Sequence, residues 1–424
     1  MNSRFLYGLV ASQRVLNAVF GILMLLIIGA FYQDSKAGEI YLIFNAALLY
    51  LVFEAGLPKI IVNKVAAAGV NFERVEKEIA SDLVHYALYY FSMSVVGAIL
   101  IVLIGYVAED TKEQLINWIL LAVTIPALSV QSFIQNVLEG AEKLVNVSSQ
   151  RLTQVVIGYG VLCISLISGA GEWAVNYYYL ALALSPLVYY RQSYIKNIIS
   201  TIIFGIRQHT LFFTFVRFKD DLGWQLRLSM QTASDYVINQ SWLVIIGLSG
   251  NLVLVSKLAL LQQVVFSIAG FSLIPGVSRF AEISRVYHKE SRDVYHKLCR
   301  KLWKETTLAA VGLIFIGALA YFYVLPLVGS MSEKMVSANV FFLYIAVVIV
   351  VVYTNYCFLL ENSKGRDNLL IISLLKMVVS FVSFAFIFFG EVYDYVQYFY
   401  FFSWVFVLIM TIVILKSREM SCES

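Results

Sequence analysis

The chain is a succession of long apolar runs separated by short polar gaps. A helix needs roughly 17–25 apolar residues to cross the core of a bilayer. Most of the runs have about that length, so the pattern predicts an all-α polytopic membrane protein with about twelve transmembrane helices. The runs lie at about residues 16–31, 40–58, 83–107, 115–138, 152–170, 175–190, 228–247, 253–275, 305–328, 338–360, 368–389 and 396–415.

Lysine and arginine gather in every second gap between these runs. The gaps on one side hold nearly all of them, whereas the gaps on the other side hold only Lys36, Lys112 and Lys334. Loops that carry positive charge stay in the cytoplasm. The charge pattern therefore predicts that both ends of the chain lie inside the cell.

The overall composition agrees with a membrane protein. Of the 424 residues, 60% are hydrophobic and only 14% are charged, and the mean hydropathy is +0.79. The net charge of +4 requires no nucleic-acid partner, because the basic residues stand where the orientation of the chain requires them. The cysteines and histidines show no paired spacing, so we expect neither a disulfide framework nor a metal site.

The loops predict two halves. The gaps on the outer side are too short to fold as an external domain, and the longest inner segments are both strongly basic. We expect a six-helix lobe at residues 1–190, a basic cytoplasmic connector at 191–224, and a second six-helix lobe at 225–424. Paired halves of this kind are common in transporters.

Polar residues recur within two of the runs. Arg227, Gln231, Asp235 and Asn239 stand four positions apart, and Asp235 lies roughly 18 Å from the outer end of its helix, at ~1.5 Å per residue. A charged stripe facing lipid is costly, so this stripe must face other helices or water. It either bonds neighbouring helices or lines a lumen. The fourth run has a similar stripe, with the same two interpretations: Gln131, Gln135 and Glu139.

Single charged residues occur in other runs. Arg14 is close enough to the inner boundary to snorkel. Glu54 and Lys59 are five positions apart, which is a poor separation for an intrahelical pair, so Glu54 needs a partner on another helix, or water. Lys257 can reach the outer boundary. Lys376 lies roughly 12 Å deep, where it either pairs with an acidic group or serves a function.

Several catalytic patterns are missing. The sequence has no phosphate-binding loop for ATP hydrolysis, and no His-Asp or Ser-His arrangement for acyl or glycosyl transfer. With outer loops this short, a sizeable external catalytic domain is also excluded. These features favour a transporter or flippase and argue against an enzyme.

Four stretches carry a resemblance to a known family. Tyr32–Tyr41 (YQDSKAGEIY) is a short acidic hairpin, and Phe53–Leu57 (FEAGL) has an acidic residue shortly before Gly-Leu. Gln135–Lys143 (QNVLEGAEK) leaves the fourth helix, and Ile274–Phe280 (IPGVSRF) is a Pro-x-x-Ser-Arg exit from the eighth. In these stretches the chain resembles the polysaccharide flippases of the multidrug/oligosaccharidyl-lipid/polysaccharide exporter superfamily, typified by bacterial O-antigen flippases.

The resemblance implies a MATE-like V of two six-helix lobes around an aqueous cavity, in the plasma (inner) membrane of a bacterium. It implies a substrate of undecaprenyl pyrophosphate carrying one oligosaccharide repeat unit of O-antigen or a similar surface polysaccharide, such as that of lipopolysaccharide. The unit would be turned from the cytoplasmic to the outer leaflet. No cofactor is implied beyond a coupling proton or sodium ion. A polysaccharide polymerase and a chain-length regulator are the implied protein partners.

The resemblance also implies functional residues. Cationic and acidic side chains line the family's cavity, and the matches by position are Arg14, Glu54, Asp235 and Arg279. Lys257 departs from the family's Gly-x-Tyr pattern. We expect cations to hold the pyrophosphate, and acidic or amide groups to line the cavity or couple transport to an ion. The expected substrate-binding residues are Arg14, Arg227, Lys257, Arg279 and Lys376, and the expected coupling or cavity-lining residues are Glu54, Gln131, Gln135, Gln231, Asp235 and Asn239.

Two other functions remain open. An ion-coupled multidrug exporter of the same superfamily would share the fold, although the basic inner loops and intramembrane cations favour an anionic lipid over a cationic drug. A polysaccharide polymerase or ligase would be a membrane enzyme, and such enzymes carry a large external loop that this sequence does not contain.

Overall fold

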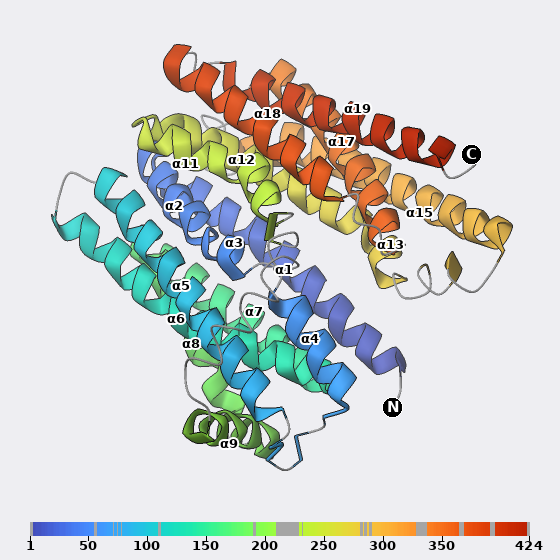
Figure 1. Cartoon of the computed structure of the whole chain (residues 1–424). Coiled ribbons are helices and arrows are strands. Elements are labelled where there is room, and N and C mark those ends of the chain that lie inside the picture. The colour runs from blue at the N-terminus through green and yellow to red at the C-terminus, as the bar shows by residue number, and fades with distance from the viewer. Residues whose placement is uncertain are drawn as a thin grey trace. The chain divides into compact units, whose positions relative to one another are not determined.

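The structure is a computed structural model, and it describes residues 3–54, 57–70, 72–73, 75–77, 79–108, 112–189, 192–208, 229–230, 232–279, 283, 286–287, 291–327, 337–363, 369–390 and 395–421. Every regular element within these ranges is a helix, and the ranges contain no strand (Figure 1). The all-α fold that the apolar pattern predicts is confirmed. The chain forms two compact units, Met1–Tyr32 with Glu39–Ala233, and Gln33–Gly38 with Ser234–Ser424.

The first unit is built from the helices of the N-terminal half. The first residues of α2, up to Gly38, group with the second unit. The elements are α1 (Ser3–Phe31), α2 (Asp34–Ala47), α3 (Tyr50–Glu54), α4 (Leu57–Ala68), α5 (Ala80–Ala108), α6 (Lys112–Gly140), α7 (Leu144–Ile167), α8 (Trp173–Leu184), the 3-10 helix η1 (Ser185–Tyr189) and α9 (Ser193–Gln208).

The second unit contains the remaining helices. Apart from Gln33–Gly38, it begins at Ser234, inside a helical stretch at 232–239. The elements that follow are α11 (Ser241–Leu248), α12 (Leu252–Ser272), α13 (Ile274–Ser278), α15 (Arg292–Leu319), the π-helix η2 (Ala320–Val324), the 3-10 helix η3 (Leu325–Leu327), α17 (Ala338–Ser363), α18 (Leu369–Gly390) and α19 (Val396–Ser421).

Each of the twelve predicted apolar runs is mainly helical over its described residues, with turn residues at 48–49, 168–169, 240 and 273. In the described part of the chain, 9 helices are long and apolar enough to cross a membrane, and Val15–Phe31 is a shorter apolar helix. Two further runs, 175–190 and 228–247, correspond to α8 with η1 and to the helical stretch 232–239 with α11. The chain is a multi-pass membrane protein.

Several helices extend beyond their apolar runs. The apolar run of α15 starts at about residue 305, yet the helix begins at Arg292. A helix that continues past the hydrocarbon keeps its backbone groups hydrogen-bonded while its polar side chains reach water. The apolar pattern therefore marks the part of each helix that crosses the membrane and misses the turns that leave it.

The second apolar run is interrupted instead of forming one helix. The structure divides it into α2, α3 and α4. Pro58 is the second residue of α4, a position where its missing N–H breaks no intrahelical bond. The fixed φ of proline suits the first turn of a helix, so Pro58 is compatible with its place in α4.

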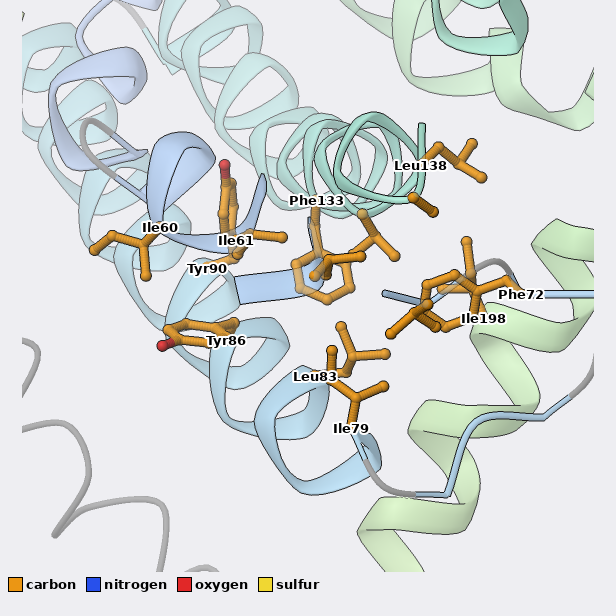
Figure 2. Close-up of a cluster of buried hydrophobic side chains, with 14 of the residues drawn as sticks. Ile60, Ile61, Phe72, Ile79, Leu83, Tyr86, Tyr90, Phe133, Leu138 and Ile198 are labelled. Atoms are coloured by element: carbon orange, nitrogen blue, oxygen red, sulfur yellow. The ribbon is translucent and has the colours of Figure 1, made fainter. Parts of the chain in front are cut away.

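The core of the first unit joins α4, α5, α6 and α9 (Figure 2). Its members include Ile60 and Ile61 of α4, Leu83 of α5 and Phe133 of α6, and α9 adds Ile198. The side chain of Phe72, from the loop that precedes α5, is fully buried in the same cluster. This cluster fixes one end of the helices that carry the polar contacts described below.

Helix α9 is fastened to the loop before α5 by polar contacts. The Asn197 side-chain amide donates hydrogen bonds to the carbonyls of Phe72, at 3.2 Å, and of Glu73, at 2.9 Å. The backbone N–H of Glu76 donates to the hydroxyl of Thr201 at 3.1 Å. The predicted connector at 191–224 thus begins with an ordered helix. Residues 209–228 lie outside the described residues.

Helix α17 is the central element of the second unit, because it contacts α12, α15, α18 and α19. A run of valines forms its middle, and four of them are buried: Val347, Val348, Val351 and Val352. A helix that is apolar on all sides can pack against several neighbouring helices at once. The two neighbours α18 and α19 also contact each other.

Candidate functional site

Two charged residues that the sequence places within the membrane form an ion pair in the second unit. The Nζ atom of Lys376 in α18 lies 2.6 Å from Oδ1 of Asp235 in the helical stretch 232–239. The lysine side chain is only 2% exposed, whereas the aspartate side chain is 45% exposed. Burying a lone ammonium costs on the order of several kcal/mol, so Asp235 supplies the charge that allows Lys376 to be buried.

Two aromatic rings complete the surroundings of this ammonium. Its Nζ lies 4.1 Å from the ring centroid of Phe358 in α17 and 5.6 Å from that of Trp404 in α19. A cation within about 6 Å of a ring centroid is attracted by the negative face of the ring. Lys376 is therefore enclosed by side chains from three other helical segments, and the accessible side of the ion pair belongs to Asp235.

Buried polar atoms lie one helical turn from the members of this group. The Oδ1 atom of Asn239, four residues after Asp235, is buried and has no hydrogen-bond partner among the described residues. The same holds for the hydroxyls of Ser380 and Thr354, four residues from Lys376 and Phe358. Because buried polar atoms in native proteins are nearly always paired, these three are candidates for contact with water or a bound molecule.

The predicted stripe at 227–239 is described only in part. Asp235 and Asn239 lie in the helical stretch 232–239, as the spacing predicts. Arg227 and Gln231 lie outside the described residues.

In the first unit, the buried carboxylate of Glu54 contacts α6. Ser129 donates a hydrogen bond to its Oε1 atom, and Ser132 lies within hydrogen-bonding reach of the same carboxylate. The Glu54 side chain is buried. The expectation that Glu54 finds a partner on another helix is confirmed.

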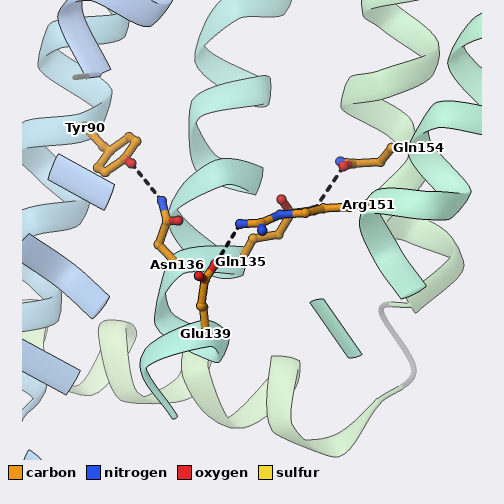
Figure 3. A network of polar contacts seen from close by, with 6 residues as sticks. All are labelled: Tyr90, Gln135, Asn136, Glu139, Arg151 and Gln154. Carbon is orange, nitrogen blue, oxygen red and sulfur yellow. Dashed lines mark hydrogen bonds and ion pairs between the residues drawn. The ribbon is translucent and has the colours of Figure 1, made fainter. Parts of the chain in front are cut away.

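The stripe of α6 contacts α7 (Figure 3). The amide of Gln135 donates to Oε1 of Gln154 at 3.1 Å, and Nη2 of Arg151 donates to Oε2 of Glu139 at 2.8 Å. The two contacts run in opposite directions along the two helices, as expected for antiparallel neighbours. In this structure Gln135 and Glu139 bond a neighbouring helix, and a role of the stripe in lining a cavity stays a prediction.

A second face of α6 contacts α5. The amide of Asn136 donates to the hydroxyl of Tyr90 at 2.9 Å, as Figure 3 shows. Gln131 is also buried, and its Oε1 atom lacks a partner among the described residues. Among the three residues of the predicted α6 stripe, Gln131 thus has a buried acceptor atom that receives no hydrogen bond from the described residues.

The other predicted cations are placed separately. Nη1 of Arg279 lies 3.6 Å from Oε2 of Glu305 in α15, and both side chains are about one-third exposed. Lys257 is half-buried in α12 and makes no ion pair within the described residues. Arg14 lies in α1, but its side chain is outside the described part of the structure. Arg279 and Lys376 belong to two separate ion pairs.

Sequence reasoning missed several partners. Ser129 and Asn136 are seven positions apart, and this helical spacing places them on one face of α6. That signal was readable from the sequence. Phe358 and Trp404 gave no usable signal, because the chain has 30 phenylalanines and 6 tryptophans and nothing in their spacing selects these two.

Comparison with known proteins identifies the fold. No protein-family model and no curated protein sequence matches the chain. Among solved structures, the lipid II flippase MurJ in an inward closed conformation is similar at 14% identity with a TM-score of 0.64, over 98% of this chain and 87% of that chain.

Two MATE structures have the same fold. An inward-facing MATE family transporter of the MOP superfamily is 14% identical with a TM-score of 0.57, over 98% of this chain and 99% of that chain. A MATE structure in complex with MaD3S is 11% identical with a TM-score of 0.51, over 97% and 94% of the two chains. The chain therefore has a fold that is also found in a lipid II flippase and in MATE structures.

Proposed function

We propose that this chain is a flippase that moves undecaprenyl-pyrophosphate-linked oligosaccharide repeat units from the cytoplasmic to the outer leaflet of a bacterial plasma membrane. The likeness of its fold to a lipid II flippase over 98% of the chain supports this most strongly. The four stretches that resemble polysaccharide flippases are the second support, and they point to O-antigen or a similar surface polysaccharide as the final polymer.

The need for such a protein follows from the cost of the crossing. A pyrophosphate with several sugars cannot enter hydrocarbon without losing strong hydration. The protein must offer polar groups at membrane depth while the lipid tail remains in the bilayer. In the second unit, the accessible carboxylate of Asp235 and the unpaired Oδ1 of Asn239 are such groups.

The ion pair suggests how transport is coupled to an ion. Asp235 is the accessible partner and Lys376 the buried one. A proton or sodium ion that bound Asp235 would remove the charge that neutralises Lys376, and the buried ammonium would then favour a different arrangement of α18. Our proposal assigns this coupling role to Asp235, with Glu54 as a second acidic group in the first unit.

The ion pair distinguishes Lys376 from the other cations that the sequence predicts to bind substrate. Lys376 is occupied by Asp235 in this structure, so contact with the pyrophosphate would require the pair to separate. Arg14, Arg227, Lys257 and Arg279 remain the candidates for direct contact with the anionic substrate. Contacts with a polysaccharide polymerase and a chain-length regulator belong to the same proposal.

A multidrug exporter is the second candidate, because two MATE structures share the fold. The two functions differ in the charge of the cargo. Reconstitution of the purified protein in liposomes separates them, with a lipid-linked repeat unit as one cargo and a cationic dye as the other. The proposal predicts that the lipid-linked unit becomes accessible on the opposite leaflet and that the dye is not moved; the reverse result would establish the exporter.

A further inference from the structure

The exposed surface of α15 changes its chemistry at one point along the helix. From Leu308 onward its exposed side chains are large and apolar, with Leu308 74% exposed and Phe315 65% exposed. Before that point the exposed side chains are mostly basic. The basic ones are Arg292, His296, Lys297, Arg300, Lys301 and Lys304, and the others are Asp293, Val294 and Thr307.

The basic and apolar parts lie on the same side of the helix. Lys297, Lys301, Lys304, Leu308 and Val311 follow one another in steps of three or four residues, and all are exposed. Residues at this spacing share one helix face. The basic stripe therefore continues directly into the apolar stripe, with one helical turn between Lys304 and Leu308.

The opposite side of α15 is held in place by packing. Tyr295 and Leu302 are buried in a cluster with Ile283, Val286 and Tyr356. The hydroxyl of Tyr356 in α17 also donates a hydrogen bond of 2.6 Å to the carbonyl of Cys299. Figure 1 shows α15 as one continuous ribbon through this region. The basic side chains thus project from a fixed part of the helix and not from a frayed end.

The distances select the part of the basic stripe that lies near lipid headgroups. An apolar stripe on a membrane-crossing helix is covered by acyl chains, and the headgroup layer adds roughly 5–8 Å on each side of the hydrocarbon. At ~1.5 Å per residue, Lys304 lies about 6 Å from Leu308, and Lys301 and Arg300 lie about 10–12 Å away. Arg292 is about 24 Å away, well beyond the headgroups.

The charge of this region is not neutralised within the described residues. Arg300, Lys301 and Lys304 form no ion pair there. The acidic neighbour Glu305 is paired with Arg279 at 3.6 Å, and Asp293 lies at the far end of the stripe. A cluster of basic residues at the end of a membrane helix attracts anionic lipids, with about 1 kcal/mol for each charge near the surface.

We propose that Arg300, Lys301 and Lys304 bind the anionic headgroup of a phospholipid whose acyl chains cover the apolar stripe of α15. The site does not depend on what the chain transports. Its two halves, cationic and apolar, match the two halves of one lipid molecule.

Matched variants of the full-length protein test this site. R300Q/K301Q removes one arginine and one lysine near the membrane, and R292Q/K297Q removes one of each farther away. Each protein is placed in nanodiscs of equal parts phosphatidylglycerol and phosphatidylcholine. Native mass spectrometry then measures the ratio of the two lipids that remain bound.

We expect R300Q/K301Q to lower the retained ratio of phosphatidylglycerol to phosphatidylcholine at least about fivefold. R292Q/K297Q should lower it less than about twofold, because Lys297 and Arg292 lie about 17–24 Å from Leu308, roughly a Debye length of ~8–10 Å or more beyond the headgroup layer. The charge-preserving exchange R300K/K301R should keep the wild-type ratio, which separates charge from folding. An unchanged ratio in R300Q/K301Q, or an equal loss in both pairs, would overturn the proposal.

Discussion

The ammonium of Lys376 lies 2.6 Å from a carboxylate oxygen of Asp235, a residue 141 positions earlier in the chain. Each of these residues, taken alone, would be costly at membrane depth. Together they leave a buried lysine with one accessible partner.

The substitution Asp235→Asn should destabilise the protein strongly. It leaves Lys376, which is 2% exposed, without its counter-charge. Removing one member of a fully buried ion pair costs about 3–5 kcal/mol. Because the Asp235 side chain is 45% exposed, we expect a loss at or below the lower end of this range. Thermal or denaturant unfolding of the purified protein in detergent measures the loss.

The double variant D235N/K376M provides the control for that substitution. Replacing a buried ion pair by apolar residues of similar volume is often neutral. We expect the double variant to recover most of the stability that D235N loses. If it is as unstable as D235N, the destabilisation does not arise from an uncompensated lysine.

The ion pair between Glu139 and Arg151 should contribute far less. Its distance is similar, 2.8 Å, but the side chains are 34% and 36% exposed. Solvent screening reduces the contribution of partly exposed ion pairs to stability to about 0–1 kcal/mol. Glu139→Gln, measured beside D235N under the same conditions, should therefore shift stability by less than about 1 kcal/mol. A loss as large as that of D235N would contradict the difference in burial.

Gly38 should tolerate no side chain. A Cβ atom built on it would lie 2.0 Å from the carbonyl oxygen of Leu252, which is backbone and cannot swing away. Gly38→Ala should destabilise the protein by about 1–3 kcal/mol, as overpacking does. The control is Gly160→Ala in α7, where a Cβ would meet nothing within 4 Å, so that alanine should be neutral or stabilising by up to ~1 kcal/mol. Equal unfolding midpoints for the two variants would contradict this prediction.

Glu54→Gln separates packing from coupling. Glutamine keeps a carbonyl oxygen that can accept the hydrogen bond from Ser129. The free energy of unfolding should therefore change by about 1 kcal/mol or less. If Glu54 binds the coupling ion, transport in liposomes should fall at least about tenfold, since the residue can no longer gain or lose a charge. Transport at the wild-type rate in E54Q would remove Glu54 from the coupling role.

Much of the fold could be predicted from the sequence, because apolar length and the positions of lysine and arginine are direct responses to the bilayer. All twelve runs are mainly helical where described. The turn at Leu48 and Leu49 in the second run and the early start of α15 at Arg292 were missed. Both depend on backbone hydrogen bonding and tertiary packing, which an apolar count does not measure.

The functional residues could be predicted as single positions but not as contacts. Depth in the membrane singled out Glu54, Asp235 and Lys376, and the expected acidic partner of Lys376 was one of two interpretations. The sequence could not show that Asp235 is that partner, because residues 141 positions apart meet only through the packing of the second unit. The sequence also could not single out the aromatic neighbours Phe358 and Trp404, because the chain contains many similar residues.

The most direct measurement locates lipid-linked oligosaccharide in cells depleted of this chain. A flippase predicts that single-repeat undecaprenyl-linked units accumulate on the cytoplasmic leaflet and that surface polymer is lost. Restoring the wild-type chain should reverse both effects. Unpolymerised units on the outer leaflet would instead indicate a polymerase, and unchanged surface polymer would contradict the flippase and favour a drug exporter.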